Sequence, residues 1–130
     1  MIQFTSTRLF TLGLLMLNVG IVSFAQILIK LGTNKVHHIF SNNSIIVSIF
    51  KVIFHPGIFW GTFLYVISLA LWIYILTKTK VSIAYPLMSV SYIAVMFLSI
   101  HFLKESVNTL QWIGAIFILI GVSTIFIFKT

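Results

Sequence analysis

The chain has 130 residues, of which 60% are hydrophobic and only 7% are charged. A soluble domain carries about 25% charged residues, so this composition excludes a water-soluble fold and predicts an integral membrane protein. The net charge of +7 comes from basic residues between apolar runs, which suits contact with anionic lipid and not with nucleic acid, and the absence of cysteine excludes disulfides and cysteine-bound metal.

Four apolar runs approach or exceed the roughly 20 residues that cross the hydrocarbon layer. They are Leu9–Leu31, Gly57–Leu76, Val81–Leu103 and Thr109–Phe128. The links 77–80 and 104–108 are so short that the runs they join must be antiparallel. We therefore predict an all-α membrane protein in which residues 1–130 form a single domain of four transmembrane helices.

The first run carries polar residues on one side. Asn18, Ser23, Gln26 and Lys30 fall within an arc of about 140° on a helix. Such a face should point away from lipid. No Asp or Glu lies in any of the four runs, and Lys30 is their only lysine or arginine. Because Lys30 is near the helix end, snorkelling to the membrane surface explains it about as well as a functional role.

The long connection 32–56 contains a second polar stripe. Ser44, Ser48, Lys51 and His55 recur at spacings of four, three and four among apolar residues. This pattern predicts one amphipathic helix over residues 44–55, of about three turns and too short to cross. We expect it to lie in the headgroup plane, and a plain spacer is the alternative.

The later runs also carry small or polar stripes. The stripe of the second run consists of Gly57, Gly61, Ser68 and Trp72, and that of the third consists of Ser82, Tyr85, Ser89 and Tyr92. In the fourth run, Gly114 and Gly121 lie seven residues apart. Small residues at such spacings let helices approach closely. Several polar faces in one small bundle favour a shared polar cavity, although polar packing between helices explains any single serine equally well.

Pro86 interrupts the hydrogen-bonding pattern of the third run. It has no N–H for the carbonyl of Ser82, so it should bend the helix. Membranes tolerate such a break where hydroxyls or neighbouring helices satisfy the carbonyl. The proline and the hydroxyl stripe are predicted to shape one wall of a headgroup cavity, and a plain structural kink is the alternative.

The basic residues at the ends of the runs are evenly divided between the two sides of the membrane. One side has Arg8, Lys78, Lys80 and Lys129, and the other has Lys30, Lys35, Lys51 and Lys104. This balance predicts no orientation. It is typical of proteins that form antiparallel pairs, but it also arises by chance in a small chain. Glu105, the single acid, is interpreted as a loop or cap residue ahead of the fourth run, where Asn108 and Gln111 resemble a capping box.

Several motifs resemble a known family. They are AYPLMS at 84–89, FLKES at 102–106, QWIGA at 111–115, IGV at 120–122 and SFAQ at 23–26, with Lys30 following. Together they resemble the EamA-like branch of the drug/metabolite transporter superfamily, and within it the small four-helix subunits of the aminoarabinose-undecaprenyl-phosphate flippase. The resemblance covers nearly the whole chain except the connection 32–56.

The related small multidrug resistance family differs at one decisive position. That family uses a membrane-embedded glutamate in its first helix to bind cationic drugs and protons, and Val22 stands at that position here. The resemblance therefore implies a bundle like that of this family, with Gly114 and Gly121 as a dimer seam, but not its chemistry.

The resemblance implies a flippase subunit, and not an enzyme, that translocates an undecaprenyl-phosphate-linked sugar across the bacterial inner membrane. The expected substrate-binding residues are Asn18, Gln26, Lys30, Trp72, Tyr85, Ser89 and Tyr92. No cofactor or metal is expected. The expected partner is a second copy or a similar small subunit, in an antiparallel or parallel pair. Two alternatives are an exporter of cationic compounds or metabolites, and a non-transporting membrane partner of a glycosyltransferase.

Overall fold

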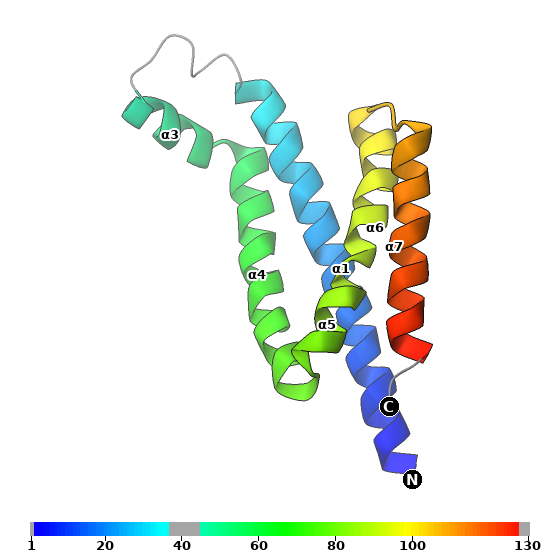
Figure 1. Cartoon of the computed structure of the whole chain (residues 1–130). Coiled ribbons are helices and arrows are strands. Elements are labelled where there is room, and N and C mark those ends of the chain that lie inside the picture. Colours follow the sequence, from blue (N-terminus) through cyan, green and yellow to red (C-terminus); the bar gives the residue numbers. More distant parts are fainter. Residues whose placement is uncertain (1, 37–44, 128–130) are drawn as a thin grey trace.

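The computed structural model describes residues 2–36 and 45–127, and all of the regular structure in these residues is helical (Figure 1). The helices are α1 (Ile2–Val36), α3 (Ile45–Ile53), α4 (Pro56–Lys78), α5 (Val81–Met88), α6 (Val90–Leu98), the π-helix η1 (Ser99–Leu103) and α7 (Thr109–Ile127). The prediction of an all-α protein is confirmed for the described residues. Side chains are described from Leu9 to Val36 and from Ile46 to Ile125. The side chain of Arg8 and the whole of Ser44 and Lys129 lie outside the described part.

Three segments are long and apolar enough to cross a membrane. They are Leu9–Val36, Pro56–Lys78 and Val81–Leu103, the last of which is made of α5, α6 and η1 in series. The described part of α7 contributes a shorter apolar helix, Thr109–Ile125. A fourth crossing by α7 therefore stays a prediction.

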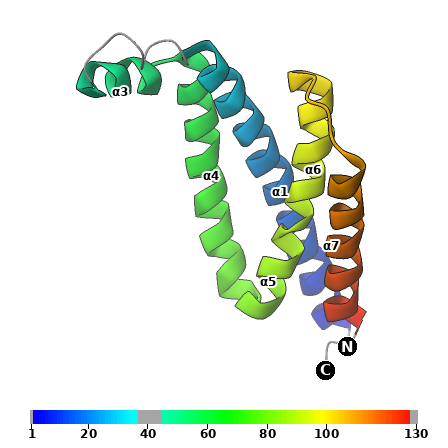
Figure 2. The same cartoon turned by 45° about the horizontal axis from the view of Figure 1, so that its top comes forward.

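Helices α1 and α4 form the most extensive contact in the structure, and they lie side by side in both views (Figures 1 and 2). Their backbones approach closely at Gly32 and Gly61. A Cβ atom on Gly61 would lie 2.9 Å from the carbonyl oxygen of Ala25, and one on Gly32 would lie 2.9 Å from the backbone nitrogen of Ile58. Only glycine fits these two positions without a shift of the backbone, as is typical of helices that associate in membranes.

The side-chain core is small. Leu15, Ile75 and Leu87 bring together α1, α4 and α5 in one buried cluster. Many large apolar side chains, such as Phe63 on α4 and Phe117 on α7, are exposed. A surface of this kind would aggregate in water, and it fits contact with lipid chains.

The third apolar segment is interrupted twice. Pro86 lies inside α5, the helix ends at Met88, and the hydroxyl of Ser89 donates to the carbonyl of Pro86. At the other end of α6, the π-helix η1 stops at Lys104, whose backbone is left-handed with a φ of 54°. Such breaks are tolerated within membranes only where the freed backbone groups find other partners.

Helix α3 has one buried polar position. Ser48 is buried, whereas Phe50, Lys51 and Phe54 are exposed. His55 does not extend the helix, because its Nδ1 accepts the backbone N–H of Gly57 at 3.3 Å and caps the start of α4. The structure therefore has a helix within the predicted segment 44–55, and its position in the headgroup plane stays a prediction.

The close contact between α1 and α4 makes a test of the packing possible. We expect Gly61→Ala to lower the free energy of unfolding in detergent micelles by about 1–3 kcal/mol, because the added methyl group meets the α1 backbone. Gly13→Ala is the matched control, since nothing lies within 4 Å of a Cβ atom at that position. Equal unfolding free energies for the two variants would contradict the close contact.

Candidate functional site

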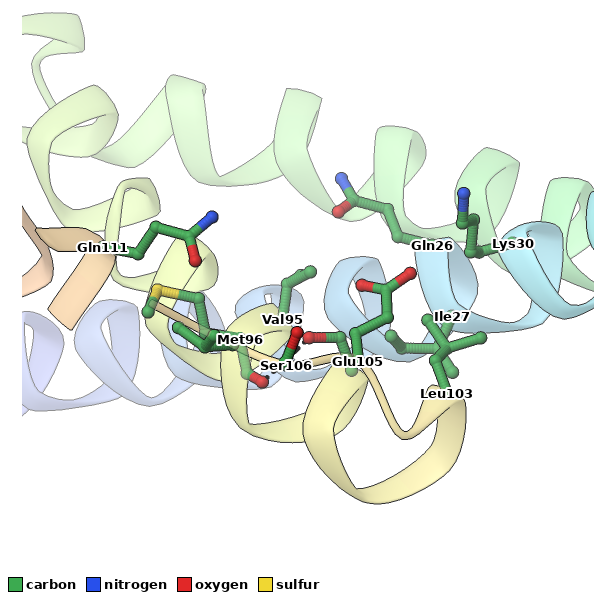
Figure 3. Close-up of a pocket in the computed structure, with 11 residues that line it drawn as sticks. Gln26, Ile27, Lys30, Val95, Met96, Leu103, Glu105, Ser106 and Gln111 are labelled. Carbon is green, nitrogen blue, oxygen red and sulfur yellow. Dashed lines mark hydrogen bonds between the residues drawn. The ribbon is translucent and has the colours of Figure 1, made fainter. Parts of the chain in front are cut away.

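A polar pocket lies where α1, α6 and η1 meet the segment that leads into α7 (Figure 3). Its volume is ≈ 450 Å³. The polar residues that line it are Gln26, Lys30, Ser99, Glu105, Ser106 and Gln111. Apolar side chains, among them Val95 and Met96, complete the wall. The pocket therefore combines one basic group, one acidic group, two amides and two hydroxyls.

Helix α1 supplies the basic group and one amide. Gln26 and Lys30 are four residues apart, which places them one above the other on the same face of the helix. Both side chains are exposed and project from α1 in the close-up (Figure 3). The structure thus brings together two residues that the sequence predicted as binding residues, and their role as ligands stays a prediction.

Glu105 supplies the acidic group, and the turn after η1 positions it. Its backbone N–H donates to the carbonyl oxygen of Ser99 at 3.3 Å, and the preceding residue, Lys104, donates to the same oxygen. The left-handed backbone of Lys104 reverses the chain there. The Glu105 carboxylate extends from this turn toward the side chains of Gln26 and Lys30 (Figure 3). Sequence reasoning assigned Glu105 to a loop or cap and missed its place in the pocket.

Gln111 supplies the second amide. Its Oε1 accepts the backbone N–H of Asn108 at 2.7 Å, which confirms the glutamine half of the predicted capping box. This bond fixes the orientation of the amide, so that Nε2 remains as a hydrogen-bond donor at the pocket. The start of α7 is therefore capped by Gln111, and the Glu105 side chain is not needed for that purpose.

These groups can hold a polar molecule by charge and hydrogen bonds. The Lys30 ammonium suits an anion, the Glu105 carboxylate suits a cation, and the amides and hydroxyls suit a ligand rich in hydroxyl groups. Among the residues that the structure describes, no three His, Asp or Glu side chains gather where they could hold a metal ion.

Asn18 lies elsewhere, in the interior between helices. It is 0% exposed, its Oδ1 accepts the hydroxyl of Ser68 at 2.8 Å, and its Nδ2 lies 3.7 Å from the Met88 sulfur. The Ser23 hydroxyl is also buried and donates to the carbonyl of Val19 at 2.7 Å. The Ser23 hydroxyl also lies 3.5 Å from the carbonyl oxygen of Ser91 on α6. The polar arc of α1 is therefore divided: Asn18 and Ser23 point toward neighbouring helices, and Gln26 and Lys30 line the pocket.

The remaining predicted binding residues do not line this pocket. Trp72 of α4 and Tyr85 of α5 meet edge to face, with ring centroids 5.3 Å apart. The Ser89 hydroxyl is engaged with the Pro86 carbonyl, and Tyr92 is 65% exposed. The structure thus places the aromatic and hydroxyl residues around the α5–α6 break, at a distance along the bundle from the polar pocket.

Gly114 and Gly121 lie on an outward face of α7. Both are exposed, and a Cβ atom on either would meet nothing within 4 Å. Neither glycine is needed for packing within the described part of this chain. Their predicted use as a dimer seam stays a prediction.

The known proteins to which this chain is similar are transporters or subunits of transporters. The model of the EamA-like transporter family matches residues 55–127. A protein of Shewanella sediminis, the probable 4-amino-4-deoxy-L-arabinose-phosphoundecaprenol flippase subunit ArnF, is 29% identical over 118 residues, which are 83% of this chain and 81% of the relative. The corresponding subunit ArnE of Aeromonas salmonicida is 37% identical over 54 residues, 42% of this chain and 47% of the relative. No solved structure matches.

The buried contact between Asn18 and Ser68 can be measured with a double-mutant cycle of Asn18→Ala and Ser68→Ala. We expect a coupling free energy of about 0.5–2 kcal/mol in micelles, because a hydrogen bond between membrane helices contributes about that much. The readout is the free energy of unfolding of the two single variants and the double variant. Strictly additive effects would show that the two side chains do not interact. Asn18 would then again be a candidate for a substrate-binding residue.

Proposed function

Because the chain belongs to the EamA-like transporter family, we propose that it is a subunit of a flippase that moves an undecaprenyl-phosphate-linked sugar across the bacterial inner membrane. The family membership predicted from the sequence is confirmed, and three membrane-crossing helices make the chain a multi-pass membrane protein. Both relatives are named as flippase subunits and neither name describes an enzyme, which supports transport without covalent change.

The main structural support for this proposal is the polar pocket. Its volume of ≈ 450 Å³ lies within the range of about 300–1,000 Å³ that small-molecule sites occupy. The headgroup of a lipid-linked sugar presents an anionic phosphodiester, for which Lys30 is a partner. It also presents sugar hydroxyls, which Gln26 and Ser106 can bind as donors or acceptors. The Ser99 hydroxyl donates to the Met96 carbonyl at 2.9 Å, so it can serve a ligand only as an acceptor.

The lipid tail is proposed to remain outside the bundle. An apolar groove of ≈ 390 Å³ follows the outer side of α1 and α4, lined by residues such as Met16, Phe24 and Leu64. An isoprenoid chain matches such a surface, because apolar atoms there need no hydrogen bonds. The headgroup would then sit in the polar pocket while the tail stays in lipid.

The breaks in the third apolar segment offer a way for the bundle to move. Helix α6 lies between the break at Ser89 and the π-helix η1, and both η1 and α6 line the pocket. Movement of α6 against α1 would open the pocket to one leaflet or to the other, as in transporters that rock one part of a bundle against another.

A second small subunit is proposed to complete the transport path. One chain has too few helices to enclose a headgroup, and the outward glycines Gly114 and Gly121 leave room for another helix at α7. The relatives are named as subunits, which supports a partner. The partner would be a second copy or a similar small chain.

The structure gives no support to a cation exporter of the multidrug type. Val22, which stands where that family has its membrane-embedded glutamate, is a buried apolar residue. The single carboxylate side chain of the sequence belongs to Glu105, outside the four predicted spans. A proton-exchanging carboxylate of that kind is therefore absent from the spans, and we prefer the flippase.

The proposal predicts that Lys30→Gln slows transport. The variant keeps a polar side chain that is one atom shorter and removes the positive charge that would hold the phosphodiester, so we expect the rate to fall by about tenfold or more. The measurement follows movement of undecaprenyl-phosphate-aminoarabinose between leaflets of vesicles that contain the chain and its partner.

Lys35→Gln serves as the control, because Lys35 is exposed on the same helix but does not line the pocket. It should transport at the rate of the unmodified protein. Equal transport rates for Lys30→Gln and Lys35→Gln would show that Lys30 does not bind the substrate. Failure of the unmodified pair to move any lipid-linked sugar would overturn the proposal as a whole.

A further inference from the structure

The pocket holds an acid that an anion-binding site does not need. The sequence contains eight Lys and Arg residues and a single Asp or Glu, and that single acid, Glu105, lines the same pocket as Lys30 (Figure 3). A carboxylate beside a bound phosphodiester would repel it, because the two negative charges would lie within a few ångströms of each other. The presence of this carboxylate therefore favours a ligand that carries a positive charge as well as the negative phosphodiester.

The described contacts give Glu105 no structural task that would explain a carboxylate. Its backbone N–H, and not its side chain, makes the bond to Ser99 that closes the turn after η1. The backbone N–H of Asn108 at the start of α7 is satisfied by the Gln111 side chain. The turn and the cap would form equally well with a neutral side chain at position 105.

We propose that Glu105 is a specificity-determining residue that binds a primary ammonium group on the headgroup, while Lys30 binds the phosphodiester of the same molecule. This inference rests on the proposed function and adds the charge pattern of the substrate. A headgroup with both charges satisfies both side chains, and a neutral sugar phosphate leaves the carboxylate without a partner. The hydroxyls of Ser99 and Ser106 provide further acceptors for the ammonium hydrogens.

Two kinds of lipid carry this chemistry. One is a polyprenyl phosphate with an amino sugar, and the other is a phospholipid with an ethanolamine headgroup. Both present an ammonium near a phosphodiester, so the test must compare them.

The experiment measures binding to the chain together with its partner subunit in nanodiscs of phosphatidylglycerol, which has no ammonium group. The two probes are undecaprenyl-phosphate-aminoarabinose and the same lipid with its amine acetylated, which is neutral at that position. We expect the unmodified chain to bind the free amine about tenfold more tightly, as a charge-assisted hydrogen bond implies. In Glu105→Gln, the ratio of the affinity for the free amine to the affinity for the acetylated lipid should fall to about one. Lys104→Gln, a change at the exposed neighbouring residue, should keep it.

The possible failures are distinguishable. If the unmodified chain with its partner binds neither probe, the proposed function fails. If it binds both probes with equal affinity, or if Glu105→Gln keeps the preference for the amine, the assignment of Glu105 is wrong while the proposed function stands. Should Glu105→Gln not fold, Glu105→Asp keeps the charge on a shorter side chain, and an unchanged ratio in a folded Glu105→Asp would support the assignment.

Phosphatidylethanolamine added to the nanodiscs tests the source of the ammonium. Competition only in large molar excess supports a lipid-linked amino sugar as the ligand. Competition at a molar ratio near one would assign the pocket to the bulk phospholipid, and would overturn the sugar part of the proposed function.

Discussion

The close backbone contact between α1 and α4 fixes the rotation of α1, and the placement of its polar groups depends on that rotation. Gly32 and Ala25 face α4, and Asn18, seven residues before Ala25, lies on the same face of the helix. Gln26 follows Ala25 by one residue and therefore points about 100° away, to the side where α6 and η1 stand. The glycine contact thus buries Asn18 and turns Gln26 toward the pocket.

The same rotation explains how the chain keeps polar groups in an apolar environment. Lipid offers no hydrogen-bond partners, so a polar side chain must find one in the protein or lie in a cavity. Asn18 and Ser68 satisfy each other, and Ser23 bonds to its own helix. Gln26 and Lys30 open instead onto a pocket shared with Glu105, where a ligand headgroup can supply the missing partners.

Much of the helical organisation could be predicted from the sequence, because apolar runs and turn residues are local signals. The positions of single polar residues could not. The 3.6-residue period placed Asn18 and Lys30 on one arc, but only the contact with α4 separates the buried residue from the exposed one. Glu105 was missed because its position depends on a π-helix and a left-handed lysine, for which the sequence has no clear signal. Gln111 was recognised as a cap because the capping-box spacing is local.

The most direct test of the polar pocket as the headgroup site is photocrosslinking. A lipid-linked amino sugar with a photoreactive group on the sugar would be crosslinked to the chain in vesicles, and the modified residues identified by mass spectrometry. Attachment should concentrate on the residues that line the pocket, such as Val95 and Met96 of α6 and Gln26 of α1. Attachment confined to the lipid-facing surface of α4, for example at Phe63 and Val66, would contradict the assignment of the site.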